Sequence, residues 1–381
     1  MIPLWTMMPK SSFSILIPDG ENLLLMHVVN CLASCSGASI HVICSERKKP
    51  MRFSRLIQSF SFYPPTDRPE DWISTINKEV EKNEIDFIMP IGESGIQKII
   101  TYQHLILDAR NKLVLLPSLQ EFDTALDKGL LSQHLLSYGL PGPLSVVVST
   151  TSDLEKVDQL TFPVISKPAI GFGGGEHIHV FKDRTACKTF FSQNGILCKQ
   201  IIQEYIEGFD IDCSILSKEG VILASTIQKG NSWAKNKFQP ANGLKFLDEP
   251  RLYKVVKVLV ESLNWSGIAH IDLRYDTKDG QFKVIEINPR YWLSVEASLI
   301  AGVNFPQLHC LASKGELFKK PGYTHVDFLS LEGLKQKIRE KKHILFRWKF
   351  IVNHTPMRFV LKDPMPILYR SISMRLKNWA K

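Results

Sequence analysis

Phe282-Lys-Val-Ile-Glu-Ile-Asn-Pro-Arg290 is the stretch around which the rest of the chain is organised. Lys283 to Ile287 is rich in β-branched residues and lies between turn residues and a proline, which predicts a strand. Alternation along a strand places Val284, Glu286 and Asn288 on one face. A carboxylate beside a carboxamide offers the oxygen ligands that Mg²⁺ prefers. The alternative is the solvent-exposed face of an ordinary hairpin.

A second predicted strand, Gly267 to Tyr275, precedes this one and is joined to it by the turn Asp276-Thr-Lys-Asp-Gly280. The two strands predict an antiparallel hairpin. On that hairpin Asp272 lies beside Glu286 on the same face, and Arg290 follows just beyond. Three oxygen ligands on two adjacent strands, with an arginine nearby, predict a site for a metal-bound polyphosphate.

The overall composition is that of an ordinary globular protein, with 44% hydrophobic and 22% charged residues in a chain of 381. This length predicts two or three domains. No apolar run reaches the ~18 residues of a membrane span, and the N-terminus lacks the pattern of a signal peptide. The seven cysteines are scattered without a Cys-x-x-Cys pair, which argues against a disulfide framework or a zinc site. We therefore expect a cytoplasmic protein.

The net charge of +9 comes entirely from the C-terminal tail. Residues 331–381 hold 13 Lys and Arg against 3 Asp and Glu, a net of +10, while the other 330 residues have a net charge of −1. Leu331 to Lys349 predicts one basic helix. The tail either packs on the protein with a solvated basic face, docks on the inner face of an anionic membrane, or binds an acidic partner. No recognised motif accompanies the charge, so nucleic acid is not an expected partner.

Residues 12–118 alternate predicted strands and helices, which indicates an open parallel α/β sheet. Its last strand is expected at Leu113 to Leu116. Such a sheet binds ligands at the carboxyl ends of its strands, where Glu93 and Ser94 are candidates to contact substrate. In a single loop, however, these two are more often turn residues. No Gly-x-Gly-x-x-Gly follows the first strand, so the sequence does not support a dinucleotide site there.

Phe162 to Gly175 is the second informative block. A predicted strand carrying Lys167 runs into a loop with four glycines in five positions. Backbone N–H groups in such a loop approach phosphate oxygens without obstruction by Cβ atoms, which favours a phosphate site over a plain hairpin turn. Upstream of this block, Phe122 to Tyr138 is expected to form one helix.

Lys199 to Asp212 is the third block, a predicted strand whose pattern is broken at Gly208 before a further strand begins. The backbone of such a segment can pair with the edge of an adenine ring. Asp210 can accept hydrogen bonds from ribose hydroxyls. Taken alone, this block would be read as a plain edge hairpin.

Together the blocks resemble the ATP-grasp superfamily from Asp127 to about Pro306, roughly half of the chain, and within it the carbamoyl-phosphate-synthase-like and carboxylate–amine ligase branches. The resemblance rests on an ordered set of motifs: Lys128, Ser166-Lys-Pro168, Gly171-Phe-Gly-Gly-Gly175, Gln203-Glu-Tyr-Ile-Glu-Gly208, Asp272 and Glu286-Ile-Asn-Pro-Arg290. It implies a mixed α/β and α+β fold. Its expected parts are a Rossmann-like pre-ATP-grasp domain over 1–118, an ATP-grasp domain of two α+β subdomains over 119–315 with a small lid at about 125–206, and a basic helical extension over 316–381.

The resemblance also implies a role for each matching residue. Mg²⁺, with Mn²⁺ as a possible substitute, is expected on Asp272, Glu286 and Asn288. Arg290, Lys167 and Glu286 are the expected catalytic residues. ATP is expected to be held by Lys128, Lys167, Gly173, Gly174, Gly175, Glu204, Tyr205, Ile206 and Asp210.

The activity implied is ATP-dependent ligation. A substrate carboxylate takes the γ-phosphoryl group to give an acyl phosphate and ADP, and an amine then displaces phosphate. The alternatives left open are a nucleotide-binding sensor or scaffold, and carbamoyl-phosphate or carboxylation chemistry on the same fold. The chain departs from the family pattern at Tyr291-Trp-Leu-Ser294, where a Gly-Ser pair is frequent, and at Glu176-His177 after the glycine loop. These departures leave both small-molecule substrates undetermined, and a homodimer is also left open.

Overall fold

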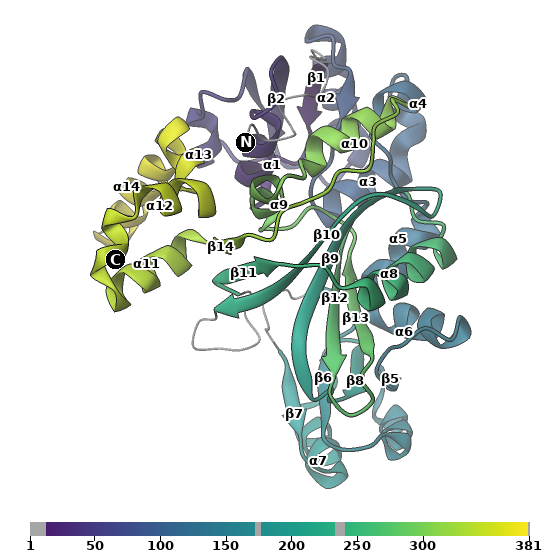
Figure 1. Ribbon diagram of the computed structural model, residues 1–381. Helices are drawn as coiled ribbons and strands as arrows, with labels where there is room; N and C mark the ends of the chain where they lie inside the picture. Colours follow the sequence, from purple (N-terminus) through teal and green to yellow (C-terminus); the bar gives the residue numbers. More distant parts are fainter. Residues whose placement is uncertain (1–12, 172–176, 233–240, 380–381) are drawn as a thin grey trace.

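The molecule is elongated, with a four-stranded sheet at each end and a six-stranded sheet between them (Figure 1). The computed structural model describes residues 13–171, 177–232 and 241–379, the last six by their backbone alone. Helices of the C-terminal segment lie to one side, next to the N-terminal domain (Figure 1). Among the described residues, no helix combines the length and the apolar character needed to cross a membrane.

The N-terminal domain is a parallel sheet with helices on both faces, as predicted. Its strands run in the order β3-β2-β1-β4. Because strand side chains alternate, Ile15 and Ile17 pack on α1 whereas Leu16 packs on α2. The elements are β1 (Phe13–Ile17), α1 (Leu25–Leu32), β2 (Ala38–Cys44), η2 (Pro50–Phe53), β3 (Ser59–Phe62), α2 (Pro69–Lys82), β4 (Phe87–Ile88), α3 (Glu93–Tyr102), η3 (Gln103–Leu105) and α4 (Ala109–Lys112).

The strand predicted at Leu113 to Leu116 was wrong, because this segment forms only an isolated parallel bridge between Ile88 and Leu113. The backbone of Leu115 bonds to side chains instead of to a neighbouring strand. Its N–H donates to Ser313 Oγ at 2.8 Å, and its carbonyl lies 2.8 Å from His309 Nε2. Side chains of a later helix therefore replace the expected strand partner.

The single helix predicted at Phe122 to Tyr138 was also wrong. Asp127 adopts an extended conformation and divides the segment into α5 (Leu119–Leu126) and α6 (Lys128–Ser137). The carboxylate of Asp127 accepts hydrogen bonds from the N–H groups of Gly129 and Leu130, so it caps the second helix. This break puts Lys128 on the first turn of α6.

The central sheet is antiparallel, with the order β13-β12-β9-β10-β11-β14. Apolar side chains of α6 and α8 cover one face of it, including Leu131, Leu135 and Leu252. The predicted hairpin is confirmed as its edge pair β12–β13. The elements are β9 (Gly208–Lys218), β10 (Val221–Ser232), β11 (Gly243–Phe246), α8 (Pro250–Ser262), β12 (Gly267–Asp276), β13 (Phe282–Asn288) and β14 (Asp327–Leu329).

The strand alternation predicted for β13 was wrong at Val284. The register steps from the pair Asp272–Glu286 directly to the pair Leu273–Val284, which leaves Ile285 as the extra residue of a β-bulge. Val284 therefore packs in the apolar core beneath the sheet. Glu286 instead faces away from that core, beside Asp272.

The distal four-stranded sheet has the order β5-β8-β6-β7 and a hydrophobic core of its own. Val164, Phe181 and Phe191 are buried there and touch neither of the other sheets' cores. The elements are β5 (Ser145–Val148), η4 (Thr151–Gln159), β6 (Val164–Pro168), β7 (His179–Phe181), α7 (Arg184–Asn194) and β8 (Gln200–Glu204). We call this subdomain the lid.

The chain then returns to the N-terminal domain, where α9 and α10 pack against α1. One basic helix was predicted at Leu331 to Lys349, which was wrong because α11 ends at Glu340 and the chain turns to bury Ile344 against Leu334. Asp363 fixes the last helices to the N-terminal domain by accepting a hydrogen bond from Ser54. The elements are α9 (Val295–Ala301), α10 (Phe305–Ser313), α11 (Leu331–Glu340), η5 (Lys342–Phe346), α12 (Trp348–His354), α13 (Met357–Lys362) and α14 (Met365–Trp379).

Candidate active site

A row of polar side chains crosses three adjacent strands on the face of the central sheet opposite α6 and α8. Asp272 on β12 pairs in register with Asp212 on β9 and with Glu286 on β13. One step along, His270 pairs with Ser214 and with Asn288. Residues directly opposite one another on neighbouring strands project to the same side. The register therefore brings the three predicted metal ligands together.

Hydrogen bonds tie this row into one cluster around Asp272. Asn288 Nδ2 donates to Asp272 Oδ2 at 3.2 Å. On the other side, His270 Nε2 lies 3.3 Å from Asp272 Oδ1, while His270 Nδ1 lies 2.9 Å from Ser214 Oγ. Ligand atoms of Asp212, His270 and Asp272 all lie within 4.8 Å of one another. This spacing lets one cation contact several of them.

Two lysines approach the cluster from the α6 and lid side. Lys128 Nζ lies 3.4 Å from Glu286 Oε2. Lys128 is held there because its N–H donates to the carbonyl of Ala169, just after β6. Lys167 on β6 is 7% exposed. Burial lowers the pKa of Lys167 to about 8, against the opposing attraction of Glu286.

The three carboxylates of the cluster outnumber these two lysines, and the environment shifts their pKa values in different directions. Burial raises the pKa of Asp212 to about 8, and burial together with the charge of Asp212 raises the pKa of Asp272. Burial also opposes ionisation of Glu286, but the charges of Lys128 and Lys167 lower the pKa of Glu286 to about 2. Without a further cation, two of the three carboxylates thus favour their protonated form. A divalent cation would favour the ionised form of both.

Arg290 links the cluster to the N-terminal domain. Its Nε donates to Glu93 Oε1 at 2.9 Å, and its NH2 group donates to Asn288 Oδ1 at 3.0 Å. Glu93 begins α3 at the carboxyl end of the parallel sheet, the edge from which a ligand contact was predicted. Ser94 follows it but forms no side-chain hydrogen bond within the described part of the chain.

The residues expected at the adenosine end lie where β8 leaves the lid and β9 begins. Glu204 accepts a hydrogen bond from the N–H of Thr161 at 2.8 Å, and the N–H of Tyr205 donates to the carbonyl of Pro163 at 2.9 Å. The side chain of Arg274 donates to the carbonyl of Ile206 at 2.7 Å and pairs with Asp210.

This hydrogen bonding leaves one oxygen of the Glu204 carboxylate and the Tyr205 N–H engaged within the protein. The expected adenine contacts therefore depend on the second oxygen of Glu204 and on the remaining backbone groups of the segment. Gly173, Gly174 and Gly175, the predicted phosphate loop, lie outside the described residues.

Sequence reasoning missed two members of the cluster, Asp212 and His270. The alternation rule that identified the hairpin could have found both, since His270 lies two residues before Asp272 on β12 and Asp212 lies two residues after Asp210 on β9. Burial lowers the pKa of His270 to about 3, so its imidazole is neutral near neutral pH. Its ring stacks on Trp292, with centroids 5.4 Å apart. A neutral imidazole beside two carboxylates adds a nitrogen donor to an otherwise oxygen-rich set.

Comparison with known proteins finds the same architecture elsewhere. Residues 125–293 match the family model of the ATP-grasp domain. D-aspartate ligase from Enterococcus faecium (strain Aus0004) is 21% identical over 311 residues, which cover 75% of this chain and 72% of that protein. Carbamoyl phosphate synthase large chain from Clostridium acetobutylicum is 26% identical over 217 residues, 54% of this chain and 20% of that one.

A solved structure resembles nearly the whole chain. N5-carboxyaminoimidazole synthetase from Staphylococcus aureus, crystallised with ADP, superimposes with a TM-score of 0.69 and 16% sequence identity. The match covers 88% of each chain. The shared fold therefore extends beyond residues 125–293 to the N-terminal parallel sheet.

Proposed function

We propose, on the premise that residues 125–293 form an ATP-grasp domain, that this chain is an ATP-dependent ligase that joins a carboxylate to an amine. The observation that carries the proposal is the convergence of three carboxylates, two lysines and an arginine on one side of the central sheet. Phosphoryl transfer needs little more from a protein than alignment and balanced charge around the phosphoryl oxygens. These side chains offer both.

The donor set fits magnesium. Asp272, Glu286 and Asn288 present carboxylate and amide oxygens from two adjacent strands, and burial with the charge of Asp212 raises the pKa of Asp272. Bound there, Mg²⁺ would neutralise charge on the β- and γ-phosphates of ATP. The neighbouring nitrogen of His270 makes Mn²⁺ an acceptable substitute.

The chain's own groups then have separable tasks. Lys128 and Lys167 hold phosphate oxygens, and bound phosphate keeps the buried ammonium of Lys167 charged. Arg290 faces the transferred phosphoryl group in an orientation fixed by Glu93. Asp210 would exchange part of its pairing with Arg274 for the ribose hydroxyls.

The proposed reaction has two balanced steps. An oxygen of the substrate carboxylate attacks the γ-phosphorus as the bond to the β-phosphate oxygen breaks, giving an acyl phosphate and ADP. The amine nitrogen then attacks the acyl carbon, phosphate leaves, and the ammonium proton passes to solvent. Aspartate is the first acid to test, because a relative over three quarters of the chain is a D-aspartate ligase.

Bicarbonate is the second candidate acid. Two of the similar proteins are a carbamoyl phosphate synthase and an N5-carboxyaminoimidazole synthetase. The resemblance therefore extends to enzymes whose names give a carbamoyl or a carboxyamino product. The same site would phosphorylate bicarbonate as it would any other carboxylate. Incorporation of labelled bicarbonate into a stable product would favour this second function.

The decisive experiment measures ADP release against a panel of carboxylates and amines, with hydroxylamine present to trap an acyl phosphate as its hydroxamate. We expect ADP and hydroxamate to form together with one class of carboxylate. A protein that binds ATP but releases no ADP with any acid would instead be a nucleotide sensor or scaffold. Glu261→Gln, at an exposed ion pair on α8, is a matched control for substitutions in the site.

A further inference from the structure

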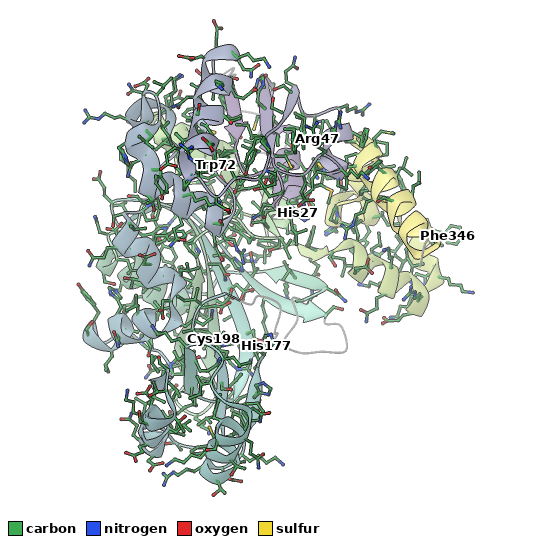
Figure 2. All side chains as sticks on the ribbon, turned by 180° about the vertical axis from the view of Figure 1, so that it is seen from behind. His27, Arg47, Trp72, His177, Cys198 and Phe346 are labelled. Atoms are coloured by element: carbon green, nitrogen blue, oxygen red, sulfur yellow. The ribbon has the colours of Figure 1, made fainter. Side chains whose placement is uncertain are left out.

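The C-terminal extension carries an exposed corner, residues 341–349 (Lys-Lys-His-Ile-Leu-Phe-Arg-Trp-Lys), which we call the basic corner. It spans η5 and the start of α12. Leu345 is 55% exposed, Phe346 89% and Trp348 56%. Ile344 is buried beneath them and anchors the turn to α11 and α12. Figure 2 shows Phe346 at the outer margin of the extension, on the side away from the central sheet.

Charge on the basic corner is of one sign. Lys341, Lys342, Arg347 and Lys349 are exposed, and the nine residues contain no Asp or Glu. Within the described part of the chain, none of these four groups forms an ion pair. Large apolar side chains and unneutralised cations are therefore presented together to whatever contacts this corner.

We propose that the basic corner docks the protein on an anionic lipid bilayer. Aromatic side chains favour the headgroup region, where an apolar ring meets a polar layer. Lysine and arginine are attracted to acidic headgroups at the same depth. Neither set suffices alone, and the corner supplies both within nine residues.

The extension favours a bilayer over the other anionic or apolar partners. Nucleic acid would use the cations and aromatic rings but not the aliphatic side chains, which acyl chains accept. A second copy of the same surface would bring like charges face to face. Aliphatic residues more than half exposed continue through the extension at Leu361, Met365, Leu368 and Ile372.

The extension lies to one side of the N-terminal domain in Figure 1, away from the lid. Asp363 and β14 fix it to the rest of the protein, so the whole chain would be held at the surface. The proposal is independent of the ligase assignment.

Co-sedimentation of the full chain with vesicles tests the proposal. We expect binding to vesicles of equal parts phosphatidylglycerol and phosphatidylcholine, weakening with added salt, and little binding to phosphatidylcholine alone. Lys341→Glu with Lys342→Glu should weaken it at least about tenfold. Phe346→Ser with Trp348→Ser should weaken vesicle binding both at low salt and with added salt.

Matched controls change equally exposed residues elsewhere. Lys182→Glu with Lys218→Glu reverses two exposed lysines, and Leu197→Ser removes a fully exposed leucine of the lid. Both variants should bind as the wild type does, and circular dichroism checks that every variant is folded. The proposal is overturned if the wild type stays in the supernatant, if charge reversal at the corner changes nothing, or if single-stranded RNA binds and the anionic vesicles do not.

Discussion

Two carboxylate sites in this molecule, a buried one at Glu296 and a half-buried row at Asp212, Asp272 and Glu286, differ in how the protein balances them. Glu296 on α9 is 1% exposed, and its two oxygens are taken by His27 Nδ1 at 2.9 Å and Asn30 Nδ2 at 2.5 Å. Burial disfavours a charged imidazole, yet the carboxylate of Glu296 raises the pKa of His27 above its usual value. One acid thus meets one base and one amide, between α1 and α9. His27 is labelled in Figure 2.

The row of Asp212, Asp272 and Glu286 has no such balance. Its three carboxylates meet Lys128 and Lys167, and burial leaves two of the three with raised pKa values. Burial of a charged group therefore does not by itself mark a functional site. A carboxylate whose hydrogen bonds are all made within the protein indicates a structural role. Carboxylates that outnumber their partners in the protein indicate a bound ligand.

Glu286→Gln, in the row, is the substitution from which we expect the largest effect. The substitution keeps the shape of the side chain and removes the charge that the two lysines and the proposed cation share. We expect ADP release to fall by about 10²- to 10³-fold. The melting temperature without ligands should stay close to that of the wild type. Full turnover in this variant would mean that the row is not catalytic.

Glu296→Ala is the counterpart in the balanced cluster. It leaves His27 and Asn30 buried without their acceptor, so the free energy of unfolding should fall by about 3 kcal/mol. Urea denaturation measures this loss. Turnover per folded molecule should be unchanged at a temperature where the variant is folded. Lost turnover without lost stability would assign Glu296 to the catalytic site and undo the comparison.

Glu93→Ala tests whether the N-terminal domain contributes to catalysis by positioning Arg290. Arg290 would keep its bonds to Asn288 and to the carbonyl of Tyr291 but lose the one that fixes its Nε. We expect kcat to fall about tenfold with the KM for ATP unchanged, because positioning alone is affected. Glu93→Gln, which still accepts a hydrogen bond, should recover part of the loss. A change confined to KM would instead assign Glu93 to ATP binding.

The smallest effect that we expect is on the pH dependence of stability, which also distinguishes the two sites. The pKa of Asp212 is raised from 3.8 to about 8 by burial, so between these values the folded state holds a proton that the unfolded state has released. The free energy of unfolding should therefore fall as pH rises through this interval, by no more than ~1.4 kcal/mol per pH unit. Saturating Mg²⁺ should reduce the fall, and Asp212→Asn should remove the part of the fall that Asp212 contributes.

His27 supplies the internal control for that measurement. Its pKa is raised in the folded state, so its stabilising contribution is present below pH ~6.5 and is lost as pH rises through the folded value. This fall should persist with Mg²⁺ and disappear in His27→Gln. Urea denaturation across the pH range, with and without Mg²⁺, separates the two. Equal sensitivity of both falls to Mg²⁺ would contradict a metal site confined to the row.

The sequence predicted the hairpin and the meeting of Asp272 with Glu286 because both follow from local alternation and one short turn. It could not predict the side of Val284, since a bulge depends on the register that the partner strand imposes. It also could not predict the ion pair of Glu93 with Arg290, which joins residues 197 positions apart. Such contacts are set by how whole domains pack.

Errors in helix boundaries had a different origin. Asp127 has an ordinary helix-compatible neighbourhood in sequence, but its carboxylate caps α6 and its oxygen also pairs with Lys199 at 2.6 Å. That second contact joins the start of α6 to the segment just before β8, and it fixes where Lys128 begins its helix. The family resemblance therefore identified the lysine, but not the contact that orients it.

We propose above that Asp272, Glu286 and Asn288 hold a divalent cation against a nucleotide. The most direct test of this proposal is titration of Mn²⁺ in the presence of ADP, with free Mn²⁺ followed by electron paramagnetic resonance. We expect Mn²⁺ binding by the wild type and by the Glu261→Gln control, and loss of that binding in Glu286→Gln. Mn²⁺ binding by Glu286→Gln equal to that of the wild type would contradict it.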